Sequence, residues 1–296
     1  MAFRALVLGA AAGGGLPQWN CGCRNCDLAR RGEIPSQTQS SVAVSVDGES
    51  WAILNASPDI RAQIAACPAL WPTGRRVSPI RAVLLTNGDI DHVAGLLTLR
   101  EQQPFDLFAT AGIHDVLDEN PVFNAVNRDI VPRRAIARDV EFDLLPGLGA
   151  TLFSVPGKVP LYNEGDVVET DLEGEQTVGV ELVAGERRIL YIPGCARITE
   201  ALAARIDGAD LLFFDGTLWR DDEMVREGLS RKTGRRMGHI SMDGPEGSIA
   251  KLARLGVGRR VFIHMNNTNP VLRPGSDERA AAEAAGWILA ADGMEV

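Results

Sequence analysis

Positive charge is scarce in this sequence, and no apolar run is long. The 296 residues include 30 lysines and arginines against 39 aspartates and glutamates, a formal net charge of -9. Because such a surface repels phosphate groups, non-specific binding to nucleic acid or to an anionic membrane has no electrostatic driver. No stretch reaches the roughly 20 apolar residues that a membrane span requires. We therefore expect partners that are neither nucleic acid nor membrane.

Few cysteines occur, and the start of the chain lacks the features of an export signal. Residues 1–15 form a short apolar run followed by glycine and alanine, without a basic start or a long apolar segment. Three of the five cysteines are Cys21, Cys23 and Cys26. This crowding suits metal ligation in a reducing compartment better than a disulfide framework. We predict a cytoplasmic protein.

The chain also lacks a linker, a low-complexity segment and a repeat of fixed period. We therefore predict that residues 1–296 form one α/β domain of two similar halves. Apolar runs predict strands at 3–8, 41–46, 51–54, 81–85, 150–155, 178–183, 188–192, 211–214, 261–264 and 287–289. Helical spacing and capping residues predict helices at 58–66, 92–100, 199–206, 243–256 and 276–286. Asp243 and Ser276 are the expected caps of the last two helices.

An acidic turn with a histidine follows the strand predicted at 81–85. Asp89, Asp91 and His92 lie between this strand and the helix predicted to begin at His92. Turns at strand ends are where open α/β folds place chemistry. A solvated turn in which Asp91 caps the helix would explain the carboxylates alone. His92 favours a metal site, because only four histidines occur and a histidine beside carboxylates can be an oriented ligand.

This turn resembles the metallo-β-lactamase superfamily motif Thr-His-x-His-x-Asp-His-x-x-Gly. The Asp91-His92 pair, the threonine and the glycine match, whereas Asn87 and Asp89 replace the two leading histidines. In that superfamily the leading pair serves one metal site and the Asp-His pair serves the other. The resemblance therefore implies a four-layer αββα sandwich in which the first metal site is lost and the second is kept.

Two further positions depart from the same first site. Lys158 stands where the superfamily has a histidine ligand after Pro-Gly, and Gly194-Cys195 stands where it has a metal-bridging aspartate. A lysine repels a metal ion and suggests an anchor for a substrate carboxylate. A solvated loop lysine would explain this position equally well.

Asp215, His239 and His264 follow predicted strands or precede a helix in the second half of the chain. The last histidine of the superfamily lies at such a strand end, so the resemblance implies that His264 completes one site with Asp91 and His92. One carboxylate and two histidines with open positions form the ligand set of non-haem Fe(II) oxygenases, although zinc accepts them too. A lone buried histidine is usually structural, but three of the four histidines fall on motif positions.

Other polar features receive no function. His114 is expected at the start of a surface helix, and the acidic run 221–223 is expected to be a solvated face. The glycines at 13–15 are followed by no Gly-Lys-Ser or Gly-Lys-Thr, which argues against a phosphate-binding loop.

Cys21, Cys23 and Cys26 are close enough in sequence to face one tetrahedral ion. Free thiols are an alternative, and a disulfide between such near neighbours has poor geometry. We predict a structural zinc site. In phosphoribosyl cyclic phosphodiesterases, whose N-terminus is similar, the fourth ligand is a histidine three residues past the last superfamily histidine. Asn267 occupies that place here, so the fourth ligand stays open.

The whole chain resembles the pyrroloquinoline quinone (PQQ) biosynthesis protein B family. The matching segments are 8–26, 38–41, 55–60, 90–92, 95–97, 99–101, 215–217, 219, 233–235, 237–239, 263–264 and 266–270. The resemblance implies an Fe(II)- and dioxygen-dependent hydroxylase. Its substrate would be a small molecule derived from a precursor peptide, a glutamate–tyrosine crosslinked intermediate that is hydroxylated on the tyrosine ring.

The resemblance also implies roles for single residues. Asp91, His92 and His264 would hold Fe(II). Lys158 and Arg197 are expected to bind substrate carboxylates. The remaining candidates, expected to orient ligands or carry protons, are Asp89, Asp215 and His239. Two other functions stay open, hydrolysis by a two-metal site and non-catalytic carriage of PQQ.

Overall fold

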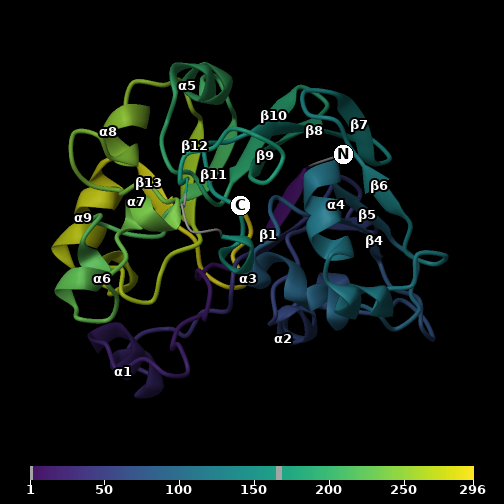
Figure 1. Cartoon of the computed structure of the whole chain (residues 1–296), viewed down its shortest axis with the longest axis horizontal. Helices are drawn as coiled ribbons and strands as arrows, with labels where there is room; N and C mark the ends of the chain where they lie inside the picture. The colour runs from purple at the N-terminus through teal and green to yellow at the C-terminus, as the bar shows by residue number, and fades with distance from the viewer. Residues whose placement is uncertain (1–2, 165–168) are drawn as a thin grey trace.

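The computed structural model describes residues 3–164 and 169–296 as an α/β sandwich of two mixed sheets. The first half of the chain builds one sheet and the second half builds the other, with helices on the outer sides (Figure 1). The largest fully buried side chains include Trp51, Tyr191 and Phe213. In the part of the chain described, no helix is both long and apolar enough to cross a bilayer. The two packed sheets with outer helices confirm the predicted α/β sandwich.

The first sheet has the strand order β1-β2-β3-β4-β5-β6. Its strands are β1 (Arg4–Gly9), β2 (Ser41–Ser45), β3 (Trp51–Leu54), β4 (Ile80–Leu84), β5 (Asp106–Ala109) and β6 (Arg133–Ala135). Pairing is antiparallel from β1 to β3 and parallel from β3 to β6. Because parallel strands end at the same edge, the segments that follow β3 and β4 lie side by side.

The second sheet has the order β13-β12-β11-β10-β9-β8-β7. Its strands are β7 (Glu141–Leu145), β8 (Leu148–Ser154), β9 (Val178–Ala184), β10 (Arg187–Ile192), β11 (Leu211–Asp215), β12 (Arg259–Ile263) and β13 (Trp287–Leu289). Strands β7 to β10 pair antiparallel, and β10 to β13 pair parallel. The segments after β11 and β12 therefore share one edge.

The helices are short. They are α1 (Arg24–Arg30), α2 (Ile60–Ala66), α3 (Ile90–Val93), α4 (Ala111–Asp118), α5 (Glu200–Ile206), α6 (Glu223–Arg226), α7 (Gly234–Met237), α8 (Ser248–Leu252) and α9 (Asp277–Ala284). Ser276 caps α9 as predicted, since its side chain accepts a hydrogen bond from Arg279 N.

Two helix predictions are wrong at their boundaries. The helix predicted at 243–256 begins at Ser248, because Gly247 N bonds Gly244 O in a turn and Asp243 is not its cap. The helix predicted at 92–100 begins two residues earlier, at Ile90, and becomes a 3-10 helix over Ala94–Leu97.

Three strands were not expected from the sequence, namely β5, β6 and β7. β6 and β7 are edge strands with charged residues at half-exposed or exposed positions, so neither forms an apolar run. Edge strands need only one hydrogen-bonded neighbour, and polar side chains are tolerated there.

The two halves of the chain are hydrogen-bonded to each other at one edge. Val178 N donates to Thr86 O at 2.9 Å, and Met265 N donates to Ala10 O at 3.0 Å. The segment after β4 therefore lies against the start of β9, and the segment after β12 lies against the segment after β1. These segments carry the polar motifs of the sequence.

Candidate metal centre and its cavity

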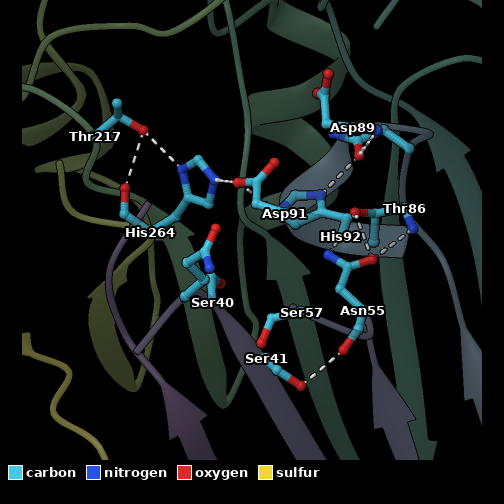
Figure 2. Close-up of polar contacts among 12 residues, drawn as sticks. Ser40, Ser41, Asn55, Ser57, Thr86, Asp89, Asp91, His92, Thr217 and His264 are labelled. Carbon is cyan, nitrogen blue, oxygen red and sulfur yellow. Dashed lines mark hydrogen bonds and ion pairs between the residues drawn. The ribbon is translucent and has the colours of Figure 1, made fainter. Parts of the chain in front are cut away.

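The turn after β4 is fixed by Asn55. Asn55 adopts a positive φ of 60°, its Oδ1 accepts from Thr86 N at 2.9 Å, and its Nδ2 donates to Thr86 Oγ1 at 2.9 Å. Ser41 Oγ donates to the Asn55 carbonyl at 2.7 Å, as Figure 2 shows. A non-glycine residue in this conformation stores strain that the surrounding bonds must offset. The turn before α3 is therefore held by Asn55, which follows β3, and by Ser41 at the start of β2.

The helical turn that carries the ligands packs closely on the segment after β3. Ala56 N donates to His92 O at 2.8 Å, and Gly95 N donates to Ala56 O at 2.9 Å. A Cβ at Gly95 would lie 2.2 Å from the carbonyl oxygen of Ser57, so only glycine fits. This contact explains the glycine of the motif.

Asp91, His92 and His264 meet where the two halves join, and each offers one atom within 4.8 Å of the others (Figure 2). Asp91 Oδ2 lies 3.1 Å from His264 Nε2 and 3.9 Å from His92 Nε2. Two donors bound to one ion at about 2.1 Å lie roughly 3.0–3.5 Å apart at octahedral or tetrahedral angles. The 3.1 Å separation lies within this range, and the 3.9 Å separation exceeds it by about 0.4 Å, so a small movement of the Asp91 and His92 side chains would fit both to a single metal ion.

His92 has one ring nitrogen fixed and the other available. Its Nδ1 lies 2.7 Å from Asn87 Oδ1, which can only accept, so Nδ1 carries the proton. Its Nε2 is buried and has no hydrogen-bond partner among the residues described. Burial lowers the pKa of His92 to about 4, so the imidazole is neutral near pH 7. A buried lone pair without a partner is what a metal ligand requires.

His264 follows β12 with a positive φ of 62°. Its Nδ1 lies 2.9 Å from Thr217 Oγ1, while Nε2 faces Asp91. Burial opposes protonation of His264, but the hydrogen bond and charge of Asp91 raise its pKa above the usual value. Burial also disfavours ionised Asp91, yet His92 and His264 hold the pKa of Asp91 below its usual range. A cation would replace the proton that these groups share.

Asp215 lies behind this site and is fully hydrogen-bonded. Its Oδ2 accepts from Cys195 N at 2.9 Å and from His239 Nδ1 at 2.7 Å, and its Oδ1 accepts from Thr217 N and Thr217 Oγ1. Burial opposes ionisation of Asp215, but His239 and His264 lower its pKa. Asp215 therefore orients His239 and Thr217, and through Thr217 it orients His264.

A cavity of about 330 Å³ opens beside these groups. Its cationic side chains are Lys158, Lys232 and Arg236, and its acidic ones include Asp89 and Glu164. Lys158 and Arg236 bind Glu164 at 3.1 and 3.0 Å, and the hydrogen bond from Arg236, with Lys158, lowers the pKa of Glu164 to about 2. Burial and the nearby Asp91 raise the pKa of Asp89.

The structure places the sequence-predicted residues in three groups. Asp91, His92 and His264 form the candidate metal site, whereas Asp89, Lys158 and His239 line the cavity. Asp215 is wholly buried behind them.

Three expectations about other residues are wrong. Arg197 pairs with Asp171 and Glu173 on the exposed surface and is absent from the residues lining the metal-site cavity. His114 lies in α4 and is 6% exposed, because its helix packs this face inward. The acidic run is a solvated face only in part, because Asp221 is exposed as expected whereas Glu223 is 8% exposed.

Several functional side chains carried no assigned role in the sequence. Thr217 and Asn266 lie inside motif segments, but a hydroxyl or amide beside a histidine has many uses. Lys232 and Glu164 come from segments without any recognisable metal or catalytic pattern, and Arg236 lies between the matching segments 233–235 and 237–239 without a motif role of its own. Only the fold brings them to the cavity.

The three thiols of Cys21, Cys23 and Cys26 converge as predicted, within 4.8 Å of one another. Asn267 Nδ2 lies 3.2, 3.4 and 3.3 Å from the three sulfurs, at the open corner of the cluster. Burial raises the pKa of the Cys23 thiol to about 12. Asn25 Nδ2 donates to Asn267 O at 2.9 Å and thereby ties α1 to the segment after β12.

Comparison with known proteins agrees with this architecture. Residues 50–265 match the family model of the beta-lactamase superfamily domain. The coenzyme PQQ synthesis protein B of Ruegeria pomeroyi is 59% identical over 294 residues, covering 99% of either chain. That of Rhizobium meliloti is 55% identical over 296 residues, covering 99% of this chain and 97% of the relative.

A solved structure shares the fold over its whole length. The crystal structure of Zn(2+)-bound PqqB from Methylobacterium extorquens matches with a TM-score of 0.98 and 58% identity, covering 99% of both chains. Because identity and coverage are high in every one of these matches, the chain belongs to the coenzyme PQQ synthesis protein B family, within the β-lactamase superfamily.

Proposed function

We propose that this chain acts in PQQ synthesis as an Fe(II)- and dioxygen-dependent hydroxylase of the tyrosine ring in a glutamate–tyrosine crosslinked intermediate. The observation that carries the proposal is the convergence of Asp91, His92 and His264 on a cavity, where the buried His92 Nε2 has no hydrogen-bond partner among residues 3–164 and 169–296. The names of the relatives support the pathway, and the ligand set supports the chemistry.

Asp91, His92 and His264 supply one negative charge and two neutral nitrogens and would hold a divalent ion with positions left open. Fe(II) bound there supplies the activation of dioxygen. Asn87 and Thr217 fix the ring nitrogens that face away from the ion, which pre-sets both tautomers.

A two-metal hydrolase is less well supported by the same residues. Asp215, His239 and His264 also offer atoms within 4.8 Å of one another, but both oxygens of Asp215 already accept hydrogen bonds and His264 belongs to the first ligand set as well. Lys158 places a cation where a second ion would need a ligand. A single metal beside the cationic side chains of the cavity suits an acidic substrate better than a two-metal hydrolytic site does.

The cationic wall consists of Lys158, Lys232 and Arg236 and would bind the substrate carboxylates by charge-assisted hydrogen bonds. Glu164 forms ion pairs with Lys158 and Arg236 and holds both side chains in place. Arg197 plays no part in this wall.

His239 is suited to accept a proton from the substrate. Its Nδ1 donates to Asp215, so Nε2 keeps its lone pair, and the ring lines the cavity. Each hydroxylation converts one ring C–H bond to C–OH with one oxygen atom of dioxygen. The other oxygen atom is reduced to water by two electrons from an external reductant together with two protons from solvent.

We further propose that Cys21, Cys23 and Cys26 bind a structural zinc ion. Thiolates select zinc, and the ion would offset the burial that keeps the Cys23 thiol protonated. Rotation of the Asn267 amide would turn Oδ1 toward the open corner and supply the fourth ligand, because the two ends of an amide are nearly equal in shape.

The test is anaerobic reconstitution with Fe(II) or Zn(II), followed by addition of dioxygen, a reductant and the crosslinked glutamate–tyrosine compound. We expect a product that gains one oxygen atom per hydroxylation with Fe(II) only. Two ions bound near Asp91 together with hydrolytic turnover would favour the hydrolase. Stoichiometric PQQ binding without turnover under any metal would favour the carrier.

A further inference from the structure

A chain of hydrogen bonds after His264 has no role in the function proposed above. Asn266 lines the cavity, and its Nδ2 donates to Thr268 Oγ1 at 2.6 Å. Thr268 Oγ1 donates to Glu223 Oε1 at 2.5 Å, and Glu223 Oε2 accepts from Trp219 N at 2.8 Å. The residues joined by this series of hydrogen bonds are buried. The series connects α6 to the cavity.

This arrangement fixes which end of the Asn266 amide faces the cavity. An ionised Glu223 carboxylate can only accept, so the Thr268 hydroxyl must donate to it. The oxygen of that hydroxyl then accepts a hydrogen bond from the Asn266 amide nitrogen. The other end of the amide, Oδ1, is left on the side away from Thr268, toward the cavity. Within residues 3–164 and 169–296, no group donates to Oδ1.

The backbone of Asn266 is held as firmly as its side chain. Asn266 N donates to Thr217 O at 2.9 Å, and Asn266 O accepts from Asn269 N at 2.9 Å. Thr217 is the residue that orients His264. The amide oxygen is therefore a pre-oriented acceptor placed two residues after a candidate metal ligand.

We propose that Asn266 Oδ1 determines specificity by accepting a hydrogen bond from the ring hydroxyl of a phenolic substrate, and that Thr268 and Glu223 position it. The inference rests on the proposed function and adds the recognition of the ring. A carboxylate carries no proton to donate to this oxygen and has the cationic wall as its partner. The phenol is the donor that belongs next to the metal, because the ring is where the reaction occurs.

The test compares binding of the crosslinked glutamate–tyrosine compound with binding of its analogue in which hydrogen replaces the ring hydroxyl. Calorimetry on zinc-loaded protein without a reductant, at about pH 8, keeps Glu223 ionised and prevents oxidation. We expect the hydroxyl compound to bind roughly tenfold more tightly, as one well-placed hydrogen bond allows. Asn266→Leu should reduce this preference to about one.

Thr268 offers a matched pair of variants. Thr268→Ser keeps the hydroxyl and should keep the preference, whereas Thr268→Val removes the hydroxyl and should lose most of it. In Glu223→Gln the new amide group donates a hydrogen bond to the Thr268 hydroxyl, so that hydroxyl donates to Asn266 instead of accepting from it. The Asn266 amide then turns its nitrogen toward the cavity. That variant should also lose the preference while zinc content stays equal to that of the unsubstituted protein.

Equal binding of the two compounds by the unsubstituted protein would overturn the inference, and so would a full preference in Asn266→Leu. These measurements require no oxidation. A preference without oxygen-dependent hydroxylation would refute the proposed function alone, and hydroxylation without a preference would refute this inference alone.

Discussion

The cysteine cluster and the Asp91 site are two candidate metal centres built on different principles. The three sulfurs are buried, and the Asn267 amide closes their open corner. At the other site one carboxylate and two imidazoles face a cavity of about 330 Å³. A closed set of soft ligands is typical of structural zinc, whereas a three-ligand site with open positions is typical of catalysis.

The two centres share one segment of chain. The segment after β12 supplies His264 to the open site and Asn267 to the closed one. Asn25 on α1 binds the backbone of Asn267 and Asn269, so the cysteine loop holds this segment from outside. The comparison suggests that one centre stabilises the segment from which the other takes a ligand.

The largest effect should come from removing a ligand of the open site. Asp91→Ala or His264→Ala should abolish metal binding there and oxygen-dependent turnover, because two remaining ligands neither hold the ion nor fix the open positions. Metal analysis should still find the zinc of the cysteine cluster. Asp129→Ala, an exposed carboxylate in a surface turn, is the control and should behave like the unsubstituted protein. Full iron and full hydroxylation in Asp91→Ala would show that the site is misassigned.

Breaking the closed centre should affect stability first. Cys23→Ser should release zinc and lower the unfolding temperature by several degrees, since metal-binding free energy contributes directly to folding. Thermal unfolding with and without a chelator measures this. Cys67→Ser, a half-buried thiol outside the cluster, should change neither zinc content nor the chelator effect. Stoichiometric zinc in Cys23→Ser would contradict the assignment.

Much of both centres could be predicted from the sequence, because their ligands lie in short motifs with fixed spacing. Asp91-His92 and the three cysteines are local patterns, and the resemblance supplied His264. The sandwich itself followed from the same resemblance. Strand cores with continuous apolar runs, such as β3 and β11, were found within one or two residues.

Contacts made only by the fold could not be predicted. Arg236 and Glu164 lie far apart in sequence and form an ion pair across the cavity, whereas Arg197 turns outward to Asp171. Glu223 belongs to an acidic run, yet its buried carboxylate accepts a hydrogen bond from Thr268 in another segment. The sequence alone does not show which charged side chains form buried contacts.

Asn87 tests whether the open site depends on ligand orientation. Although it replaces a superfamily histidine ligand, it fixes the tautomer of His92. Asn87→Ala should weaken metal affinity about 10- to 100-fold, the range for loss of such an orienting contact, without changing the stoichiometry of one ion. Asn87→Asp keeps an acceptor and should retain most of the affinity. Titration with Zn(II) under anaerobic conditions gives both values, and an unchanged affinity in Asn87→Ala would show that the contact is dispensable.

The smallest effect concerns Glu223, which lies near the segment shared by the two centres. Burial raises its pKa to about 7, above the 4.5 of a free side chain. A carboxyl that binds its proton more tightly when folded stabilises the protein fully below its unfolded pKa and loses this contribution as pH rises through its folded pKa.

The contribution of Glu223 to the free energy of unfolding should therefore decline between about pH 4.5 and 7. Glu223→Gln cannot ionise, so its urea-unfolding free energy should fall less over this interval than that of the unsubstituted protein. Glu186→Gln, which removes an exposed carboxyl in the turn between β9 and β10, is the control for the loss of one negative charge. An identical pH dependence in Glu223→Gln would show that the buried carboxyl stays ionised throughout. The hydrogen bond from Thr268 would then outweigh the cost of its burial.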